Sequence, residues 1–367
     1  MPKKRLIICC DGTWNWPDQK GNPTNVVKLV RAILPADDLG VPQVVFYDTG
    51  VGTGNLLDRI AGGIFGVGLA ENVKQTYSFI VDNYQPDDEL FFFGFSRGAH
   101  TVRSLGGLIG LIGLIPKPHM DEFLQAWAYY RTPPQARTET QRREFLARFP
   151  EDAQPRKTRI DFIGVWDTVG TMGIPTGPLR LIGQRRYSFH NTNLGDNVAR
   201  AFQALALDER RRFFPPAIWK REAGLEERLK GYGIEQQLLE QTWFVGAHSN
   251  VGGGYPDTGL SDQAFGWMAR RAMRYGLALD KTYVEHTQEN SRYFLVNSRT
   301  AKWRLTPARL RTVCQTDASE RVHHTAMARL HATADNCNFD PYPYDCPNLR
   351  DLVTARDTAL QTLIDRD

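Results

Sequence analysis

Residues 89–103 read Glu-Leu-Phe-Phe-Phe-Gly-Phe-Ser-Arg-Gly-Ala-His-Thr-Val-Arg. An apolar run, Leu90–Phe93, leads into Gly94-Phe95-Ser96-Arg97-Gly98, and a helical pattern follows. The pattern G-x-S-x-G between a strand and a helix is the signature of a nucleophile elbow, a sharp turn that exposes a serine hydroxyl. The glycines leave room for this strained turn. The stretch therefore predicts Ser96 as a nucleophile at the end of a buried strand.

The rest of the chain alternates strands with helices in the same way. Apolar runs that end in small or acidic residues occur at Leu6–Cys10, Val44–Tyr47, Leu90–Phe93, Ile160–Val165 and Trp243–Val245. Helical patterns follow the first three of them, at Asn25–Ile33, Gly68–Asn83 and Ala99–Leu114. The alternation predicts an α/β fold with a doubly wound, mostly parallel sheet. Ligands of such sheets bind beyond the carboxyl ends of the strands.

Two segments interrupt the alternation, residues 117–158 and residues 172–241. Both are expected to be helical insertions in a single domain that spans residues 1–367, and either could cover the active site. Further helices are predicted at Asn197–Arg211, Leu225–Leu239 and Ala264–Tyr275. From residue 280 on, a less regular tail is expected.

An acid and a histidine follow the fourth and fifth apolar runs. Asp167 comes directly after Val165-Trp166, and His248 opens the glycine-rich stretch that ends at Tyr255. Together with Ser96 they give the chain order Ser, Asp, His of an α/β-hydrolase triad. In that chemistry Ser96 attacks, His248 takes and returns the proton, and Asp167 orients the imidazole.

Other roles stay open for these residues. His248 could serve only as a hydrogen-bond anchor for its loop, and Asp167 could cap a turn through Thr168. The reserve candidates for the acid are Asp208, Asp257 and Asp262, and those for the base are His323 and His324.

The first strand ends in Cys10-Asp11-Gly12-Thr13-Trp14, which offers a second group of site residues. In this fold the loop after an early strand and the residue after the nucleophile supply the N–H groups of the oxyanion hole. Those donors would come from Gly12 or Thr13 and from Arg97. Asp11 would then fix the loop by accepting N–H bonds. Alternatively, Asp11 and Asp48 bind a divalent cation near the site; otherwise no metal and no cofactor is expected.

Four ordered motifs together resemble an uncharacterised family of α/β-hydrolase-like domains, which includes phospholipase effectors of bacterial type VI secretion. The motifs are Cys10–Asn15, Gly94–Ala99, Val165–Val169 and His248–Tyr255, and the segment Ala204–Arg210 also looks like one of the family. The resemblance runs from about residue 4 to about residue 330. One departure is Asn250, which stands where many relatives are expected to carry Asp.

The resemblance implies a serine hydrolase that cleaves carboxylic esters, and it leaves phospholipid acyl esters open as substrates. Trp14, Phe95 and Tyr255 are the candidates for the substrate pocket. Two alternatives remain at this stage. One is a metal-assisted phosphoester or nucleotide hydrolase built on Asp11 and Asp48, and the other is a non-catalytic binding module on a hydrolase scaffold.

Bulk properties narrow the partners of the chain. It has 367 residues and a formal net charge of +4, with no basic tail that would point to nucleic acid. The longest apolar stretch, Leu105–Pro116, is too short to cross a membrane, and no secretory signal is recognised. Synthesis in the cytoplasm is expected, with export by a route that needs no signal peptide left open. Transient membrane contact stays open, and the sequence does not predict the oligomeric state.

Overall fold

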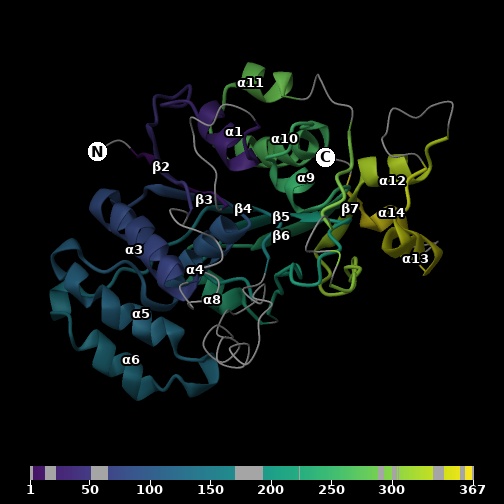
Figure 1. Ribbon diagram of the computed structural model, residues 1–367. Coiled ribbons are helices and arrows are strands. Elements are labelled where there is room, and N and C mark those ends of the chain that lie inside the picture. Colours follow the sequence, from purple (N-terminus) through teal and green to yellow (C-terminus); the bar gives the residue numbers. More distant parts are fainter. Residues whose placement is uncertain are drawn as a thin grey trace.

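A computed structural model describes residues 3–12, 22–50, 65–169, 193–222, 224–287, 293–299, 304, 306–333, 343–355 and 360–365 (Figure 1). At its centre lies an eight-stranded sheet with the strand order β2-β1-β3-β4-β5-β6-β7-β8. Every neighbouring pair of strands is parallel. The strands are β1 (Arg5–Cys10), β2 (Gln43–Asp48), β3 (Glu89–Phe95), β4 (Phe162–Trp166), β5 (Arg200–Ala206), β6 (Leu238–Phe244), β7 (Glu320–His323) and β8 (Ile364–Asp365).

The strand order confirms the predicted doubly wound α/β fold. From β1 the chain moves outward to β2, then crosses back over β1 to β3, and all later strands are added on that side. The direction of winding therefore reverses between β1 and β3, which is where ligands of such sheets bind. The elbow that begins at the end of β3 lies at this position.

Helices cover both faces of the sheet because its central strands are apolar on both sides. Leu6 and Ile8 of β1 pack with helices α3 and α4, whereas Ile7 and Cys9 pack with α1 and α10 on the opposite face (Figure 1). The helices of these two layers are α1 (Asn25–Ala32), α3 (Phe65–Asn83), α4 (Arg97–Ile112) and α10 (Gly259–Arg274). The helices predicted for these parts of the chain are thus confirmed.

The helix predicted at Asn197–Arg211 is wrong, because residues 200–206 form strand β5 in the middle of the sheet. Alanine-rich sequences favour helices, but here burial on both faces decides the structure. Phe202 and Ala204 pack into the core around α10, and Leu205 packs into a separate core near the C-terminus. The strand predicted at Trp243–Val245 is the end of β6, which already starts at Leu238. The helix predicted at Leu225–Leu239 is therefore too long, and only α8 (Glu226–Lys230) forms there.

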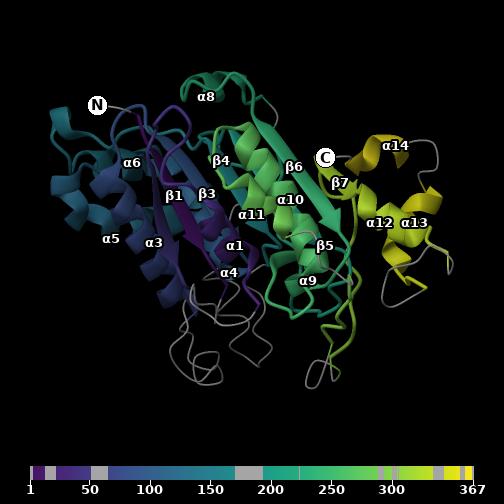
Figure 2. The same ribbon diagram turned by 90° about the horizontal axis from the view of Figure 1, so that it is seen from above.

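The segment 117–158 contains helices that pack away from the elbow. Its helices are α5 (Phe123–Arg131) and α6 (Glu139–Leu146), with short 3₁₀ turns at Lys117–Glu122, Pro134–Ala136 and Glu151–Ala153. The N–H of Leu114, just past the C-terminal end of α4, donates to the carbonyl of Arg156, whereas Ser96 lies at the other end of that helix. Figure 2 shows α6 and α8 on the side where the strands begin. These helices therefore do not cover Ser96.

The region after residue 280 is more regular than predicted, because it adds two strands to the sheet. β7 pairs with β6, and β8 pairs with β7. The smaller helices of the C-terminal half are α9 (His248–Gly252), α11 (Lys281–His286), α12 (His324–Leu330), α13 (Pro347–Ala355) and α14 (Leu360–Leu363). None of the helices in the described ranges is long and apolar enough to span a membrane.

Candidate active site

The predicted elbow forms at the end of β3. Ser96 adopts φ 57° and ψ −114°, an unfavourable backbone conformation for a residue with a side chain, and α4 begins at the next residue. The turn needs its two glycines. A Cβ on Gly94 would lie 2.6 Å from the backbone N of Ala99, and a Cβ on Gly98 would lie 2.0 Å from the carbonyl oxygen of Cys10. The tight turn holds the half-buried Ser96 side chain beyond the end of the strand.

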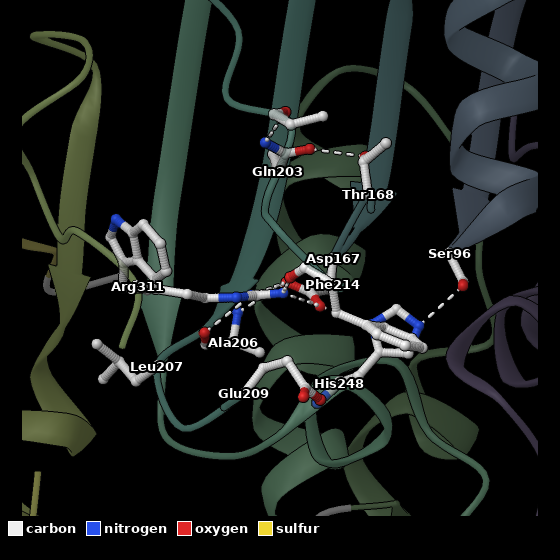
Figure 3. A network of polar contacts seen from close by, with 12 residues as sticks. Ser96, Asp167, Thr168, Gln203, Ala206, Leu207, Glu209, Phe214, His248 and Arg311 are labelled. Carbon is white, nitrogen blue, oxygen red and sulfur yellow. Dashed lines mark hydrogen bonds and ion pairs between the residues drawn. The ribbon is translucent and has the colours of Figure 1, made fainter. Parts of the chain in front are cut away.

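The structure brings Ser96, His248 and Asp167 together in one line, although they follow three different strands (Figure 3). The Oγ atom of Ser96 lies 2.8 Å from Nε2 of His248. The Nδ1 atom of the same imidazole lies 2.6 Å from Oδ2 of Asp167. With Asp167 ionised, Nδ1 carries the proton, so Nε2 is the nitrogen that can accept the serine proton.

Two phenylalanine rings hold the imidazole of His248 from its sides. The ring of Phe95 lies 4.7 Å from the imidazole centroid, and that of Phe214 lies at 5.4 Å in an edge-on arrangement. Only 6% of His248 is exposed. These contacts restrict the rotation of the ring, so its two nitrogens stay directed at Ser96 and Asp167.

Asp167 is fully buried and has φ 39°, a left-handed conformation. Its Oδ1 accepts the backbone N–H of Ala206 at 3.0 Å, and Arg311 donates to both carboxylate oxygens, at 2.6 and 3.1 Å. Burial alone would raise the pKa of Asp167, but Arg311 and His248 hold it well below its usual range. The carboxyl group is therefore ionised at neutral pH. Thr168 bonds to Gln203 instead of forming a turn with Asp167.

Two acids after β5 fix the backbone of the histidine loop. Asp208 accepts the N–H of Gly246 at 2.8 Å, and Glu209 accepts the N–H of His248 at 3.2 Å. Glu209 also forms an ion pair with Arg211. Burial alone would raise the pKa of Glu209, but Arg211 keeps it below its usual value. The position of His248 thus depends on carboxylates from a strand that lies beside its own.

Asn250, the departure from the expected family pattern, has a structural role. Its Oδ1 accepts the N–H groups of Ala247 and Val296, both at 3.2 Å, and its Nδ2 donates to the carbonyl of Phe294 at 3.1 Å. The amide can donate and accept at once, which a carboxylate cannot do. Asn250 therefore ties the start of α9 to the segment 293–299.

At the end of β1, Asp11 is surrounded by protein donors. Its Oδ1 accepts the N–H of Gly12 at 2.6 Å, and its Oδ2 accepts the hydroxyls of Thr24 and Tyr47. This geometry does not support Gly12 as an oxyanion donor, because its N–H already binds the Asp11 carboxylate. Thr13, the alternative donor, lies outside the described residues, and Arg97 occupies the first position of α4.

The described residues give no support to a cation site at Asp11 and Asp48. The Asp48 carboxylate accepts the N–H of Gly50 and the side-chain amide of Asn72, so protein donors occupy it as they occupy Asp11. Within the described segments, no group of three His, Cys, Asp or Glu side chains is placed to hold a metal ion.

The three residues predicted to line the substrate pocket differ in their positions. Phe95 is only 4% exposed and packs against His248, so it supports the imidazole instead of lining an open pocket. Tyr255 is half-buried beyond the end of α9. Trp14 lies outside the described residues, as does the part of the second predicted insertion between residues 170 and 192.

The reserve acids and bases bind other partners. Asp257 accepts the N–H of Gly259, Asp262 forms a buried ion pair with Lys28, and Asp208 binds Gly246. His323 is paired with Thr325 and stacks on Phe244.

Sequence reasoning missed three residues that touch the hydrogen-bonded array of Ser96, His248 and Asp167. They are Glu209, Phe214 and Arg311. Glu209 follows β5 in a segment that was incorrectly predicted to be helical, and Phe214 lies in the irregular stretch beyond it. Arg311 lies 144 residues from Asp167 in the chain, and no local pattern marks it.

The family model described as the catalytic domain of Tle1-like type VI secretion system (T6SS) phospholipase effectors matches residues 4–271. An uncharacterised protein of Saccharomyces cerevisiae is 29% identical over an alignment of 230 residues, and the match covers 57% of this chain and 31% of that protein. The chain therefore spans about a third of the length of this curated relative.

Two solved structures are similar over most of the chain. One is an uncharacterised protein from Pseudomonas aeruginosa, with 18% identity, a TM-score of 0.44 and coverage of 76% of this chain and 46% of that chain. The other is the Tle1 effector bound to the VgrG spike of the type 6 secretion system, with 21% identity, a TM-score of 0.38 and coverage of 70% and 52%. Because the family model takes in the sheet from β1 to β6 with Ser96, Asp167 and His248, the chain belongs to the family of Tle1-like phospholipase effector catalytic domains of type VI secretion systems.

Proposed function

We propose that this chain hydrolyses carboxylic esters through an acyl-enzyme on Ser96, with His248 as general base and Asp167 as the acid that orients it. The observation that carries the proposal is the unbroken line of hydrogen bonds from Ser96 Oγ through both imidazole nitrogens to Asp167, at 2.8 and 2.6 Å. The strained elbow that presents Ser96 supports the same assignment.

In the first half of the reaction, Ser96 Oγ forms a bond to the carbonyl carbon of the ester while its proton passes to His248 Nε2. The carbonyl oxygen becomes an oxyanion. When the tetrahedral intermediate collapses, the bond to the alcohol oxygen breaks, and His248 returns the proton to the departing alcohol. Asp167 stabilises the transient imidazolium and keeps the proton on Nδ1.

In the second half, a water molecule attacks the acyl carbon of the Ser96 ester and gives a proton to His248 Nε2. The bond to Ser96 Oγ then breaks, and the serine regains its proton from the imidazolium. The products are the carboxylic acid and free Ser96. No external oxidant, reductant or cofactor enters this balance.

The oxyanion is assigned to the start of α4. The N–H of Arg97 follows the nucleophile directly, and the helix N-terminus adds a favourable dipole for negative charge. The sequence-predicted Thr13 remains the candidate for a second donor.

For the natural substrate we propose the acyl esters of phospholipids. The support for this narrower statement is membership of a family whose description names phospholipase effectors. A lipid substrate would bring the chain into transient contact with a membrane surface, as the sequence left open.

The direct test is ester hydrolysis by the wild-type chain and by Ser96→Ala and His248→Ala, with and without EDTA. Both substitutions should lower kcat by at least about 10⁴-fold on a short soluble ester and on phospholipid vesicles, since each removes a member of the array. Ser104→Ala is the matched control, because Ser104 is a buried serine two turns along the same helix. It should retain wild-type turnover. Turnover that survives in Ser96→Ala, or is abolished by EDTA, would overturn the proposal.

A further inference from the structure

We propose that Arg311 is a positioning residue for the Asp167 carboxylate, which it holds in place as an anion and whose negative charge it offsets. His248 therefore stays neutral, and able to act as a base, at lower pH than it would without Arg311. The catalytic consequence rests on the proposed function, whereas the effect on the titration of His248 does not.

The contact between Arg311 and Asp167 is bidentate and buried. Nη1 of Arg311 lies 2.6 Å from Oδ1, and Nη2 lies 3.1 Å from Oδ2. The side chains are 3% and 0% exposed. A planar guanidinium that binds both oxygens at once fixes the rotation of the carboxylate as well as its position. Oδ2, the atom that faces His248, therefore cannot swing away from the imidazole.

Arg311 is itself held by two backbone carbonyls. Nη1 also donates to the oxygen of Ala206 at 2.9 Å, and Nη2 donates to that of Phe214 at 2.7 Å. Phe214 carries the ring that packs against His248 (Figure 3). The guanidinium thus links the acid of the array to one of the two rings that hold its histidine.

The charges around His248 explain why this cation matters. An unpaired carboxylate beside an imidazole stabilises the imidazolium at all times, including in the resting state where a neutral base is needed. Here the charge of Asp167 is balanced by that of Arg311, and the charge of Glu209 is balanced by that of Arg211. Two further titratable groups described near this cluster are the half-buried Tyr255, next to Arg211 and Glu209, and the buried Asp208, which accepts the N–H of Gly246.

Loss of Arg311 would have two effects of the same sign. The uncompensated negative charge would favour a proton on His248 at a higher pH than before. The buried carboxyl would also accept a proton more readily, because Arg311 opposes the effect of burial on the pKa of Asp167. Either change lowers, at acidic pH, the fraction of molecules in which His248 is neutral and Asp167 is ionised.

The experiment follows the titration of His248 by NMR, in protein labelled at the histidine Cε1 carbons. The signal is assigned from its absence in His248→Gln. Relative to wild type, Arg311→Gln should raise the titration midpoint of His248 by about one pH unit. Arg311→Lys keeps the charge and should keep the midpoint close to wild type, while its lost bidentate geometry lowers kcat.

Arg271→Gln is the matched control. Arg271 is also a buried arginine with two carboxylate partners. Its Nη2 donates to both oxygens of Asp365 and its Nε donates to Glu240, and it lies on α10 away from Ser96. Its loss should lower the melting temperature without moving the His248 midpoint. An unchanged midpoint in folded Arg311→Gln, or an equal shift in Arg271→Gln, would overturn the inference. If Arg311→Gln fails to fold, a lysine variant whose midpoint rises by a full pH unit would overturn it equally.

The same variants are then assayed on a short soluble ester between pH 5 and pH 9. The acidic limb of kcat/KM should move with the midpoint of His248. If His248 of the wild-type chain gives a measurable titration midpoint but the chain hydrolyses no ester, the proposed function fails. The titration still decides the role of Arg311.

Discussion

At Asp167, one buried carboxylate receives a backbone N–H, an imidazole and both arms of a guanidinium. Asp167→Asn would replace one carboxylate oxygen by an amide nitrogen, which cannot accept the hydrogen bond from Nδ1–H of His248. It would therefore favour the wrong imidazole tautomer. We predict a loss of kcat on the order of 10⁴-fold with the overall fold retained. Steady-state ester kinetics together with circular dichroism would measure both. A loss below tenfold would mean that Asp167 does not orient His248.

The same residue predicts how stability depends on pH. The pKa of Asp167 is lower in the folded chain than its usual value, which the unfolded chain shows. Such a group stabilises the folded state above about pH 4 and loses this contribution as the pH falls below it. Urea unfolding at pH 7 and at pH 3 should therefore show a smaller loss of stability in Asp167→Asn than in wild type. A larger loss in the variant would contradict the assigned direction.

Some residues of the site are predictable from the sequence and others are not. Ser96 and Asp167 directly follow apolar strands, and His248 comes four residues after the end of another. Glycines flank Ser96 and follow His248, so the sequence surroundings of all three mark them. Arg311 carries no such mark, since it sits in an irregular segment and gains its role only when the chain folds back over β5. Gly12 was misjudged because a carboxylate next to it in the chain captures its N–H.

Among the elements, α4 is held closely at its start, because its first turn touches the end of β1. A Cβ on Gly98 would come within 2.0 Å of the Cys10 carbonyl oxygen, which is backbone and cannot move aside. Gly98→Ala should therefore destabilise the fold by at least about 3 kcal/mol and lower the melting temperature.

Gly106→Ala on the same helix is the matched comparison. Its Cβ would meet the end of the Ile163 side chain at 3.2 Å, a flexible neighbour. We predict stability equal to wild type or up to about 1 kcal/mol higher, since alanine favours a helix more than glycine does. If the two alanine variants had equal melting temperatures, the close contact at Gly98 would be refuted.

One central element that sequence reasoning missed is β5. Its alternation of apolar residues is hidden by alanines and by Gln203, whose side chain bonds to Gln241 of β6 and to Thr168 after β4. These partners exist only in the sheet. Local propensity favours a helix there, and the burial of both faces overrides it.

At the scale of the whole molecule, the sheet is closed at its far end by the short strand β8. Asp365 accepts bonds from Thr242 at 2.8 Å, Trp267 at 2.7 Å and Arg271 at 3.0 and 3.1 Å. Asp365→Ala should cost about 3 kcal/mol, because it removes one of the two acids paired with the buried Arg271 and also the acceptor of the bonds from Thr242 and Trp267. Asp82→Ala, which breaks the exposed pair with Lys117, should leave stability unchanged. Thermal unfolding would compare them, and equal melting temperatures would contradict the account.

The winding of the whole sheet explains why the site lies where it does. The reversal between β1 and β3 opens the position at which the elbow stands, and the parallel strands β4 and β6 deliver Asp167 and His248 to the same edge. The alternation of strands and helices in the sequence predicts that residues after the strands meet at one edge, whereas the strand order is seen only in the structure.

The central claim is that Ser96 is a nucleophile activated by His248. Labelling with a fluorophosphonate, followed by mass spectrometry of the modified peptide, tests it most directly. The account predicts one adduct, on Ser96, formed in the wild-type chain with or without EDTA and lost in His248→Ala. The account would be contradicted if the folded wild-type chain formed no fluorophosphonate adduct, or formed one on a residue other than Ser96.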